Sequence, residues 1–229
     1  ITNIAAADIG PIGKVKLSAN WMCACGEDAE DAALYDTVQA VGMEFCPQLG
    51  ISIPVGKDSL SMRTRWQDSE GEDQEVVAPL SLVISAFAPI TDVRRTLTPE
   101  LDPRPDTLLV LIDLGHGANR LGASCLAQVY GQIGDVAPDV TAGDVAGLFS
   151  SVQELNQTDR LLAYHDRSDG GLLATLTEMA FAGACGLKVD ISALGADPVA
   201  ALFTEEIGAV LQIEARHEPG VREILAQHG

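Results

Sequence analysis

Two acidic residues and two glycines lie close together in the segment 165–171, which reads HDRSDGG. Asp166 and Asp169 offer carboxylate oxygens, which Mg²⁺ prefers as ligands, and Gly170 and Gly171 let a backbone approach a phosphate closely. A divalent cation held here would bridge to phosphate oxygens. The segment therefore indicates a site for a magnesium-bound phosphate group. A serine or aspartate N-cap followed by a glycine turn would explain the same residues structurally.

The neighbouring residues predict a strand that leads into a helix. Residues 161–163 form a brief apolar run, and Leu172, Leu176 and Met179 recur at helical spacing after it. Residues 165–171 then lie at the N-terminus of that helix, where unpaired backbone N–H groups and the helix dipole favour anions. We expect Leu176 to be a core position of this helix.

The composition is that of an acidic globular protein. The 229 residues are 47% hydrophobic, which is ample for a packed core, and the net charge is −19. Such a charge repels a nucleic-acid backbone, and no run approaches the roughly 20 apolar residues of a membrane span, so we expect neither nucleic acid nor membrane as a partner. A phosphate-bearing ligand would have to be held by magnesium and backbone N–H groups.

The chain ends and the cysteines indicate the protein's context. Neither an initiator Met nor a basic leader precedes Ile1, and residues 1–7 read as the tail of an apolar element. The C-terminal LAQHG stops inside or just past a helical pattern, so we expect a piece of a longer protein. The five cysteines are odd in number and irregularly spaced, as in a reducing cytosol, so we expect a cytoplasmic location. Core packing is the favoured interpretation of Cys23 and Cys25, and the four histidines are too scattered to indicate a metal site.

Alternating strands and helices predict an α/β (α+β) fold with mixed sheets covered by helices. The proline-rich stretch 98–106 is the expected domain boundary. The acidic tract 68–75 is expected at a hairpin tip or in a mobile loop, and the apolar run 80–88 as a strand buried on both faces. We expect the other helices over 28–47, 121–132, 142–157, 198–203 and from residue 218, and the other strands over 51–55, 62–66, 107–114, 187–191 and 207–213.

A second polar segment, 55–62, reads VGKDSLSM and lies between two predicted strands. It lacks the first glycine and the spacing of a Walker A loop. Lys57 could neutralise phosphate charge, while Asp58 and Ser59 could hydrogen-bond a substrate or orient the lysine. We expect a ligand-facing polar loop over 56–61 with Lys57 as the candidate catalytic residue. The alternative is a hairpin turn that carries a solvated lysine–aspartate pair.

Two adjacent acids, Glu205 and Glu206, come directly before the predicted strand 207–213. Charged side chains are mostly solvated in folded proteins. A solvated strand edge is therefore the favoured interpretation, and support of a site from behind is the alternative.

Five blocks of the sequence resemble, in this order, the large single-chain type of the phosphoribosylformylglycinamidine synthase (FGAM synthetase) family. They are TNIAAADIG at 2–10, KLSANWM at 16–22, IPVGKDSLSMRTRW at 53–66, PLSLVISAF at 79–87 and HDRSDGGLLATLTEMAFAG at 165–183. The resemblance covers nearly the whole chain and implies an aminoimidazole-ribonucleotide-synthetase-like fold. It implies that residues 1–101 are the C-terminal portion of an N-terminal, ATP-binding-type subdomain and that residues 102–229 are the C-terminal-type subdomain. Both would come from the second half of the duplicated amidine-forming region.

For the whole enzyme, the resemblance implies a glutamine-dependent carbon–nitrogen ligase of de novo purine biosynthesis. ATP phosphorylates the amide oxygen of formylglycinamide ribonucleotide, and ammonia from glutamine then displaces phosphate to give the amidine. The implied cofactors are ATP or ADP and Mg²⁺. The implied partners are formylglycinamide ribonucleotide and further domains of the same chain, including a glutaminase domain. Because the glutaminase domain and further metal ligands are not in this sequence, we expect the piece alone to be inactive.

The resemblance also implies roles for single residues. Asn3 and Asp166 match magnesium ligands of the family's motifs, and Ser168 matches a nucleotide contact. The other candidates for contact with nucleotide or phosphate are Lys57, Asp58, Ser59, Gly170 and Gly171. The alternative function is a non-catalytic half whose nucleotide only braces the fold. Another superfamily member, such as a selenophosphate synthetase or a thiamine-phosphate kinase, is opposed by the KLSANWM and IPVGKDSLSMRTRW blocks.

Overall fold

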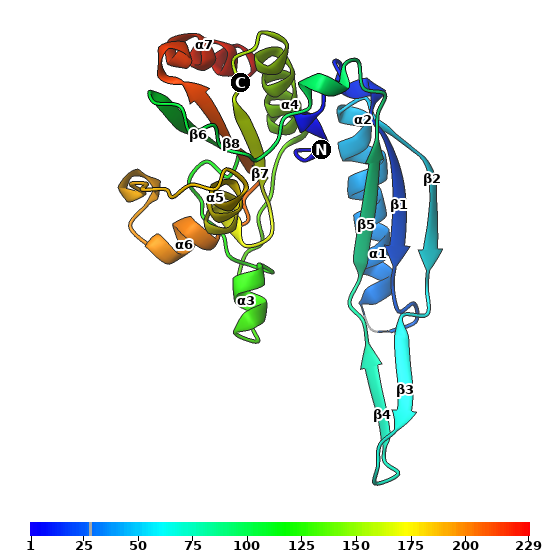
Figure 1. Cartoon of the computed structure of the whole chain (residues 1–229). Coiled ribbons are helices and arrows are strands. Elements are labelled where there is room, and N and C mark those ends of the chain that lie inside the picture. Colours follow the sequence, from blue (N-terminus) through cyan, green and yellow to red (C-terminus); the bar gives the residue numbers. More distant parts are fainter. Residues whose placement is uncertain (28) are drawn as a thin grey trace. The chain divides into compact units, whose positions relative to one another are not determined.

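The computed structural model describes residues 1–27 and 29–229. The chain divides into two compact units (Figure 1): a larger unit made of Ile1–Pro11 and Ile90–Gly229, and a smaller unit made of Ile12–Pro89. Each unit combines a β-sheet with helices, which confirms the predicted mixed α/β class. The contacts place residues 1–11 and 90–101 with the larger unit, so the subdomain division at residues 101 and 102 remains a proposal.

The smaller unit is built on a mixed three-stranded sheet in the order β2-β1-β5. The central strand β1 (Lys16–Met22) runs parallel to β2 (Ser52–Ser59) and antiparallel to β5 (Ser81–Phe87). The predicted helix over 28–47 is present from Glu30 onward, and residue 28 lies outside the described residues. It consists of α1 (Glu30–Val38), a π-helical segment (Gln39–Phe45) and α2 (Cys46–Gln48).

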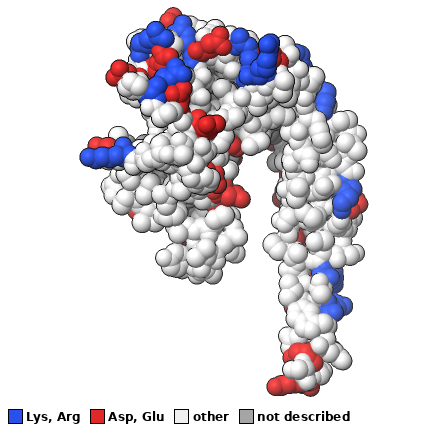
Figure 2. Space-filling model, in the orientation of Figure 1, with Lys and Arg blue, Asp and Glu red and all other residues white. Residues whose placement is uncertain are grey.

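A hairpin extends the smaller unit. It pairs β3 (Arg63–Gln67) with β4 (Asp73–Val77) in antiparallel register. Asp68 accepts backbone hydrogen bonds from Glu70 and Glu72 in the turn between them. The acidic tract therefore lies at a hairpin tip, as predicted, and Figure 2 shows acidic side chains gathered there.

The predicted loop over 56–61 is wrong, because β2 continues to Ser59. Lys57 and Ser59 are partners of Asn20 and Met22 on β1, so the backbone of this polar stretch is used in a parallel ladder. The register shifts by one residue before Val55, a bulge of the kind that tolerates a proline in an edge strand. Polarity was a poor guide here because an edge strand needs no apolar side chains on its exposed face.

The expectation that residues 80–88 are buried on both faces is also wrong. The strand β5 is present, but it is an edge strand of the described sheet, with Val83 49% and Phe87 60% exposed. A continuous apolar run does not by itself tell one covered face from two.

The larger unit contains an antiparallel three-stranded sheet in the order β6-β8-β7. The strands are β6 (Thr107–Asp113), β7 (Ala163–Arg167) and β8 (Gly208–Glu214), of which the central β8 is the most buried. The helices are α3 (Cys125–Val129), α4 (Ala142–Gln157), α5 (Gly171–Ala182), α6 (Pro198–Phe203) and α7 (Glu218–His228). Short 3₁₀ turns complete the described elements at Ile4–Ala6, Ile12–Lys14, Val93–Arg95, Ser192–Leu194 and Ala215–His217.

The predictions for α4, α6 and the start of α7 are confirmed to the residue. The strand predicted over 187–191 is wrong, since this stretch has no strand structure and leaves Leu187 and Val189 40% and 47% exposed. The helix predicted over 121–132 is much shorter, because Ser124 caps it at Cys125 and Gly131 follows it with a positive φ. Across residues 1–27 and 29–229, no helix has both the length and the apolar character needed to cross a membrane.

Helix α5 packs its apolar face into the core of the larger unit, as its spacing predicts. Leu172, Leu176 and Met179 are buried there with Ala163 of β7 and Val210 of β8. This packing places the start of the helix, and the polar turn before it, directly after β7.

We expect Leu176→Ala to lower the free energy of unfolding by about 2–5 kcal/mol, because it leaves a cavity at a residue that is 9% exposed. Leu173→Ala on the same helix is the matched control, since Leu173 is 40% exposed and its loss should cost only about 0.5 kcal/mol. Thermal melts compare the two variants. Equal shifts of the melting midpoint would contradict the assigned face of α5.

Candidate functional site

Asp166 lies near the end of β7 and is 8% exposed. Thr2 Oγ1 donates a hydrogen bond of 3.1 Å to Asp166 Oδ2, and His165 Nδ1 lies 3.6 Å from Asp166 Oδ1. Burial acts to raise the pKa of Asp166, but the contacts with His165 and Thr2 outweigh it and hold the pKa below its usual value. The carboxylate is therefore ionised at neutral pH, as a cation ligand must be.

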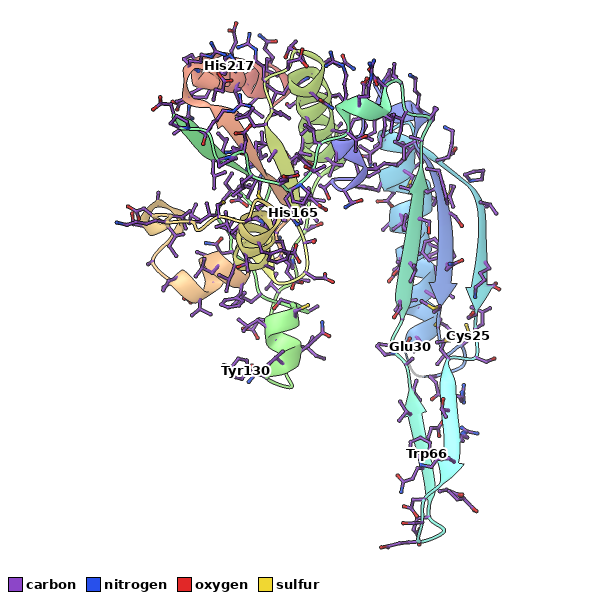
Figure 3. All side chains as sticks on the ribbon, viewed as in Figure 1. Cys25, Glu30, Trp66, Tyr130, His165 and His217 are labelled. Atoms are coloured by element: carbon purple, nitrogen blue, oxygen red, sulfur yellow. The ribbon has the colours of Figure 1, made fainter. Side chains whose placement is uncertain are left out.

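His165 is the immediate neighbour of this carboxylate. Its Nε2 lies 2.7 Å from Glu178 Oε2 on α5, and its Nδ1 lies 2.8 Å from the backbone oxygen of Asp166. The contact with Asp166 raises the pKa of His165 against the opposing effect of burial, and Glu178 raises it further. Figure 3 labels His165 where β7 runs beside α5. The imidazole thus braces the end of β7 against the helix.

Asn3 and Asp166 line the same cavity, although they lie far apart in the sequence. The cavity has a volume of about 430 Å³ and belongs entirely to the larger unit. Asn3 makes no side-chain hydrogen bond to cap the 3₁₀ turn that follows it. The remaining lining residues are Ile4, Ala6, Ala7, Thr96, Leu97, Pro99, Tyr164 and His165. The two residues matched to magnesium ligands are therefore brought together, and their roles remain predictions.

Gln153 of α4 holds the N-terminal segment, Ile1–Pro11, in place. Its Nε2 donates to the backbone oxygens of Ala5 and Ala7 at 2.8 and 2.9 Å. Its Oε1 accepts from the amides of Ile9 and Gly10 at 2.8 and 2.9 Å. The Gln153 side-chain amide thus uses all four of its hydrogen-bonding positions to bind the N-terminal segment, which carries Asn3, and so fixes its position.

The turn between β7 and α5 has a left-handed backbone conformation that requires glycine. Gly170 and Gly171 have φ values of 81° and 67°, and a Cβ on Gly171 would lie 2.5 Å from the backbone oxygen of Thr204. The Gly171 amide donates to Ser168 O, and the Gly170 amide donates to Glu205 Oε1, both at 2.9 Å. Backbone conformation and packing thus explain why glycine stands at both positions, and both amides already have hydrogen-bond partners. The exposed Ser168 side chain remains the nearest candidate for contact with a ligand.

Lys57, Asp58 and Ser59 all lie on β2 of the smaller unit. Lys57 Nζ donates a hydrogen bond of 2.8 Å to Ser59 Oγ. Alternation along a strand places these two side chains on one face of the sheet and Asp58 on the other. Lys57 is the partner of Asn20, which alternates with the buried Leu17 and Ala19 of β1, so Lys57 lies on the opposite face from that core.

The interpretation of Glu205 and Glu206 as a solvated strand edge is wrong. Glu206 is fully buried, and both of its carboxylate oxygens accept from the guanidinium of Arg120, at 2.5 and 2.8 Å. Glu205 Oε1 accepts from the amides of Cys125 and Gly170. The alternative, support of the site from behind, fits the positions of both residues.

Residues that sequence reasoning missed include Gln153, Arg120 and Arg167. Arg167 is 3% exposed and donates to Asp113 and to the backbone oxygens of Glu206 and Ile207. For Gln153 a signal existed, because it lies four residues after the buried Phe149 on the apolar face of α4. A polar residue at such a position usually has a specific partner. The two arginines had no comparable signal.

The donors at the cavity suit Mg²⁺ bound together with a nucleotide. Asn3 and Asp166 offer an amide oxygen and an ionised carboxylate, both hard ligands. Mg²⁺ usually takes only one or two protein ligands beside phosphate oxygens and water. Cys125, Asp169 and Glu205 form a separate group whose ligand atoms all lie within 4.8 Å of one another, but a thiol suits magnesium poorly and Glu205 already binds two amides.

Comparison with known families identifies the fold. The FGAR-AT PurM_N-like domain matches residues 1–89, and the AIR synthase related protein C-terminal domain matches residues 104–229, more than half of the chain. The chain belongs to the AIR synthase-related family. Together the two matches confirm an FGAM synthetase-like member of this family, as the five sequence blocks indicate.

Solved structures with the AIR synthase-related fold resemble the chain over nearly its whole length. PurLQS from Thermotoga maritima is 13% identical with a TM-score of 0.61, over 100% of this chain and 34% of that one. T. maritima PurL complexed with ATP is 13% identical with a TM-score of 0.58, over 98% of this chain and 32% of that one. HypE of E. coli, a hydrogenase maturation protein, is 18% identical with a TM-score of 0.61, over 98% of this chain and 65% of that one. The chain therefore spans about a third of the PurL chains, and at these identities the likeness concerns the fold alone.

Proposed function

We propose that the chain is part of an ATP-dependent, amidine-forming ligase of de novo purine biosynthesis, located in the cytoplasm. In the full-length enzyme it would help convert formylglycinamide ribonucleotide, glutamine, ATP and water into the amidine, with release of ADP, phosphate and glutamate. The observation that carries the proposal is the meeting of Asn3 and Asp166 in one cavity. The solved complexes of T. maritima PurL with ATP, AMPPCP, ADP and FGAR add support, since they are complexes of a protein with the same fold.

The residues of the cavity would hold the nucleotide rather than react with it. Asn3 and Asp166 would ligate Mg²⁺, and Ser168 would donate to a phosphate oxygen. When bound, Mg²⁺ neutralises charge on the phosphate oxygens. Asp166 is ready for this role because its partners keep it ionised, and Gln153 fixes the segment of Asn3 before any ligand arrives. Phosphoryl transfer asks a protein mainly for such positioning and charge stabilisation.

A second candidate is a nucleotide site that only braces the fold. The near-complete burial of Asp166 favours a tightly held ion over an exchanging one. Extensive dialysis of the full-length enzyme separates the two candidates. A nucleotide that exchanges within a turnover time supports catalysis at this site, and one that survives dialysis supports bracing.

The proposed ligase activity is tested with the full-length protein that contains this chain. We expect phosphate release that requires ATP, glutamine and formylglycinamide ribonucleotide together, with the amidine as product. Phosphate release that does not depend on the ribonucleotide, or no amidine by mass spectrometry, would contradict the proposed reaction.

We expect Lys57→Ala in the full-length enzyme to lower kcat/KM by at least about tenfold, because a cation aimed at transferred phosphate stabilises charge in the transition state. The melting midpoint should hardly change, since the side chain is exposed and its truncation costs under about 0.5 kcal/mol. Lys16→Ala, an exposed lysine of the same sheet, is the matched control. Unchanged kinetics with saturating ATP and glutamine in Lys57→Ala would leave β2 with a structural role only.

A further inference from the structure

The segment 204–207 contacts both ends of the turn that follows β7. At the first end, Arg167 Nε donates to the backbone oxygen of Glu206 at 2.5 Å, and Arg167 Nη2 to that of Ile207 at 3.3 Å. At the second end, the amide of Gly170 donates to Glu205 Oε1 at 2.9 Å. Residues 168 and 169 lie between these two fixed points, with exposed side chains.

Glu205 accepts a hydrogen bond from the Gly170 amide, next to the thiol of Cys125, and the same oxygen also bonds to a second element. Its Oε1 also accepts from the amide of Cys125, the first residue of α3, at 2.9 Å. One carboxylate oxygen therefore joins the turn to the start of α3. The backbone behind Glu205 cannot easily shift, because the neighbouring Glu206 is fully buried in its pair with Arg120.

The fit between the turn and this segment leaves no spare room. A Cβ on Gly171 would lie 2.5 Å from the oxygen of Thr204 and 2.7 Å from the backbone carbon of Phe203. Thr204 is itself buried, and its Oγ1 donates to the backbone oxygen of Arg120. The turn is thus seated against the backbone of residues 203–204 and held there by the side chain of Glu205.

We infer that Glu205 is a positioning residue for the nucleotide-binding turn. Its effect depends on the length of its side chain, here called its reach. An acceptor oxygen at the end of a three-carbon side chain fixes the Gly170 amide. The fixed amide in turn sets the position of the Ser168 hydroxyl relative to Asp166. The inference rests on the proposed function, since it assigns Glu205 a part in the same nucleotide site. Groups that orient the ligands of a metal site commonly matter about 10- to 100-fold for metal affinity or activity.

Two substitutions separate reach from charge. Glu205→Gln keeps an acceptor oxygen at the same reach and removes the charge, whereas Glu205→Asp keeps the charge and shortens the side chain by one methylene. Glu223→Asp is the matched control, because Glu223 is exposed on α7 of the same unit. The measurement is the dissociation constant of Mg·ADP for the full-length protein, taken well below the melting midpoint of each variant.

We expect Glu205→Gln and Glu223→Asp to bind Mg·ADP within about twofold of the wild type, and Glu205→Asp to bind about 10- to 100-fold more weakly. Hydrogen exchange at the Gly170 and Cys125 amides should speed up in Glu205→Asp alone. If Glu205 has a merely structural role, both Glu205 variants should instead show a lower melting midpoint and an unchanged affinity for Mg·ADP. That result would overturn the inference. Weak binding by Glu205→Gln would also overturn it, because the charge and not the reach would then matter.

Asp166→Asn distinguishes this inference from the proposed function. If Asp166→Asn loses Mg·ADP and Glu205→Asp does not, the positioning role falls and the proposed site stands. If Asp166→Asn binds Mg·ADP as the wild type does, the proposed site falls, and the role of Glu205 in it falls too.

Discussion

Asp166→Asn in the full-length enzyme should lower the affinity for Mg·ATP or Mg·ADP by at least about tenfold, because it removes the charged ligand of the proposed cation. The fold should change little. Asparagine has nearly the same shape, and its side-chain oxygen can still accept the hydrogen bond from Thr2. The purified variant should therefore carry less nucleotide than the wild type at a similar melting midpoint.

Asp135→Asn is the matched control for this result. It makes the same substitution at an exposed aspartate of the larger unit, away from the cavity. Calorimetric titration with Mg·ADP, together with the nucleotide content of the purified proteins, gives the comparison. Equal nucleotide content and equal affinity in the wild type, Asp166→Asn and Asp135→Asn would remove the metal role of Asp166.

Arg120→Met should have the largest effect on stability, about 3–5 kcal/mol, because it leaves a buried carboxylate without its partner. Glu206 has a fully buried side chain, and the guanidinium of Arg120 is bound to both of its oxygens. The same substitution removes the hydrogen bond from Arg120 to the backbone oxygen of Asp139. We expect a clearly lower melting midpoint and a looser β7–α5 turn, because residues 204–207 support it.

The double variant Arg120→Met with Glu206→Gln should recover at least half of the lost stability. Glutamine is neutral, and its side-chain oxygen can still accept the hydrogen bond from the backbone amide of residue 120. This hydrogen bond is 3.1 Å long in the wild type. The two residues are in contact, so the two substitutions are expected to be strongly non-additive. Additive losses in thermal melts of the two single variants and the double variant would contradict a buried ion pair.

Sequence periodicity located the larger unit's helices well where local signals were strong. Thr141 caps α4, and Asp197 and Pro198 begin α6, so local capping residues mark where both helices start. The stretch 187–191 alternates Leu187, Val189 and Ile191 with Lys188 and Asp190, as a strand would, but it pairs with none of the described sheets, and alternation alone does not supply a pairing partner. The sequence pattern does not distinguish an edge strand from a central one, because β5 is apolar in sequence and yet has exposed apolar residues at the edge of its sheet.

The candidate site was predictable only in part. The five sequence blocks pointed to Asn3 and Asp166, and the structure brings both to one cavity. The partners of the supporting residues were not predictable, because they lie far away in the sequence. No local pattern indicates that Glu206 pairs with Arg120. The place of Gln153 on the apolar face of α4 signals a specific partner, but it does not show that this partner is the backbone of residues 5–10.

We propose that a divalent cation binds between Asn3 and Asp166. The most direct test is a crystal structure of the full-length enzyme grown with ADP and Mn²⁺ in place of Mg²⁺, with anomalous diffraction used to locate manganese. We predict an anomalous peak within about 2.5 Å of a carboxylate oxygen of Asp166, with the side-chain oxygen of Asn3 as a further ligand. Manganese bound to the nucleotide elsewhere, with this cavity empty of anomalous signal, would contradict the account.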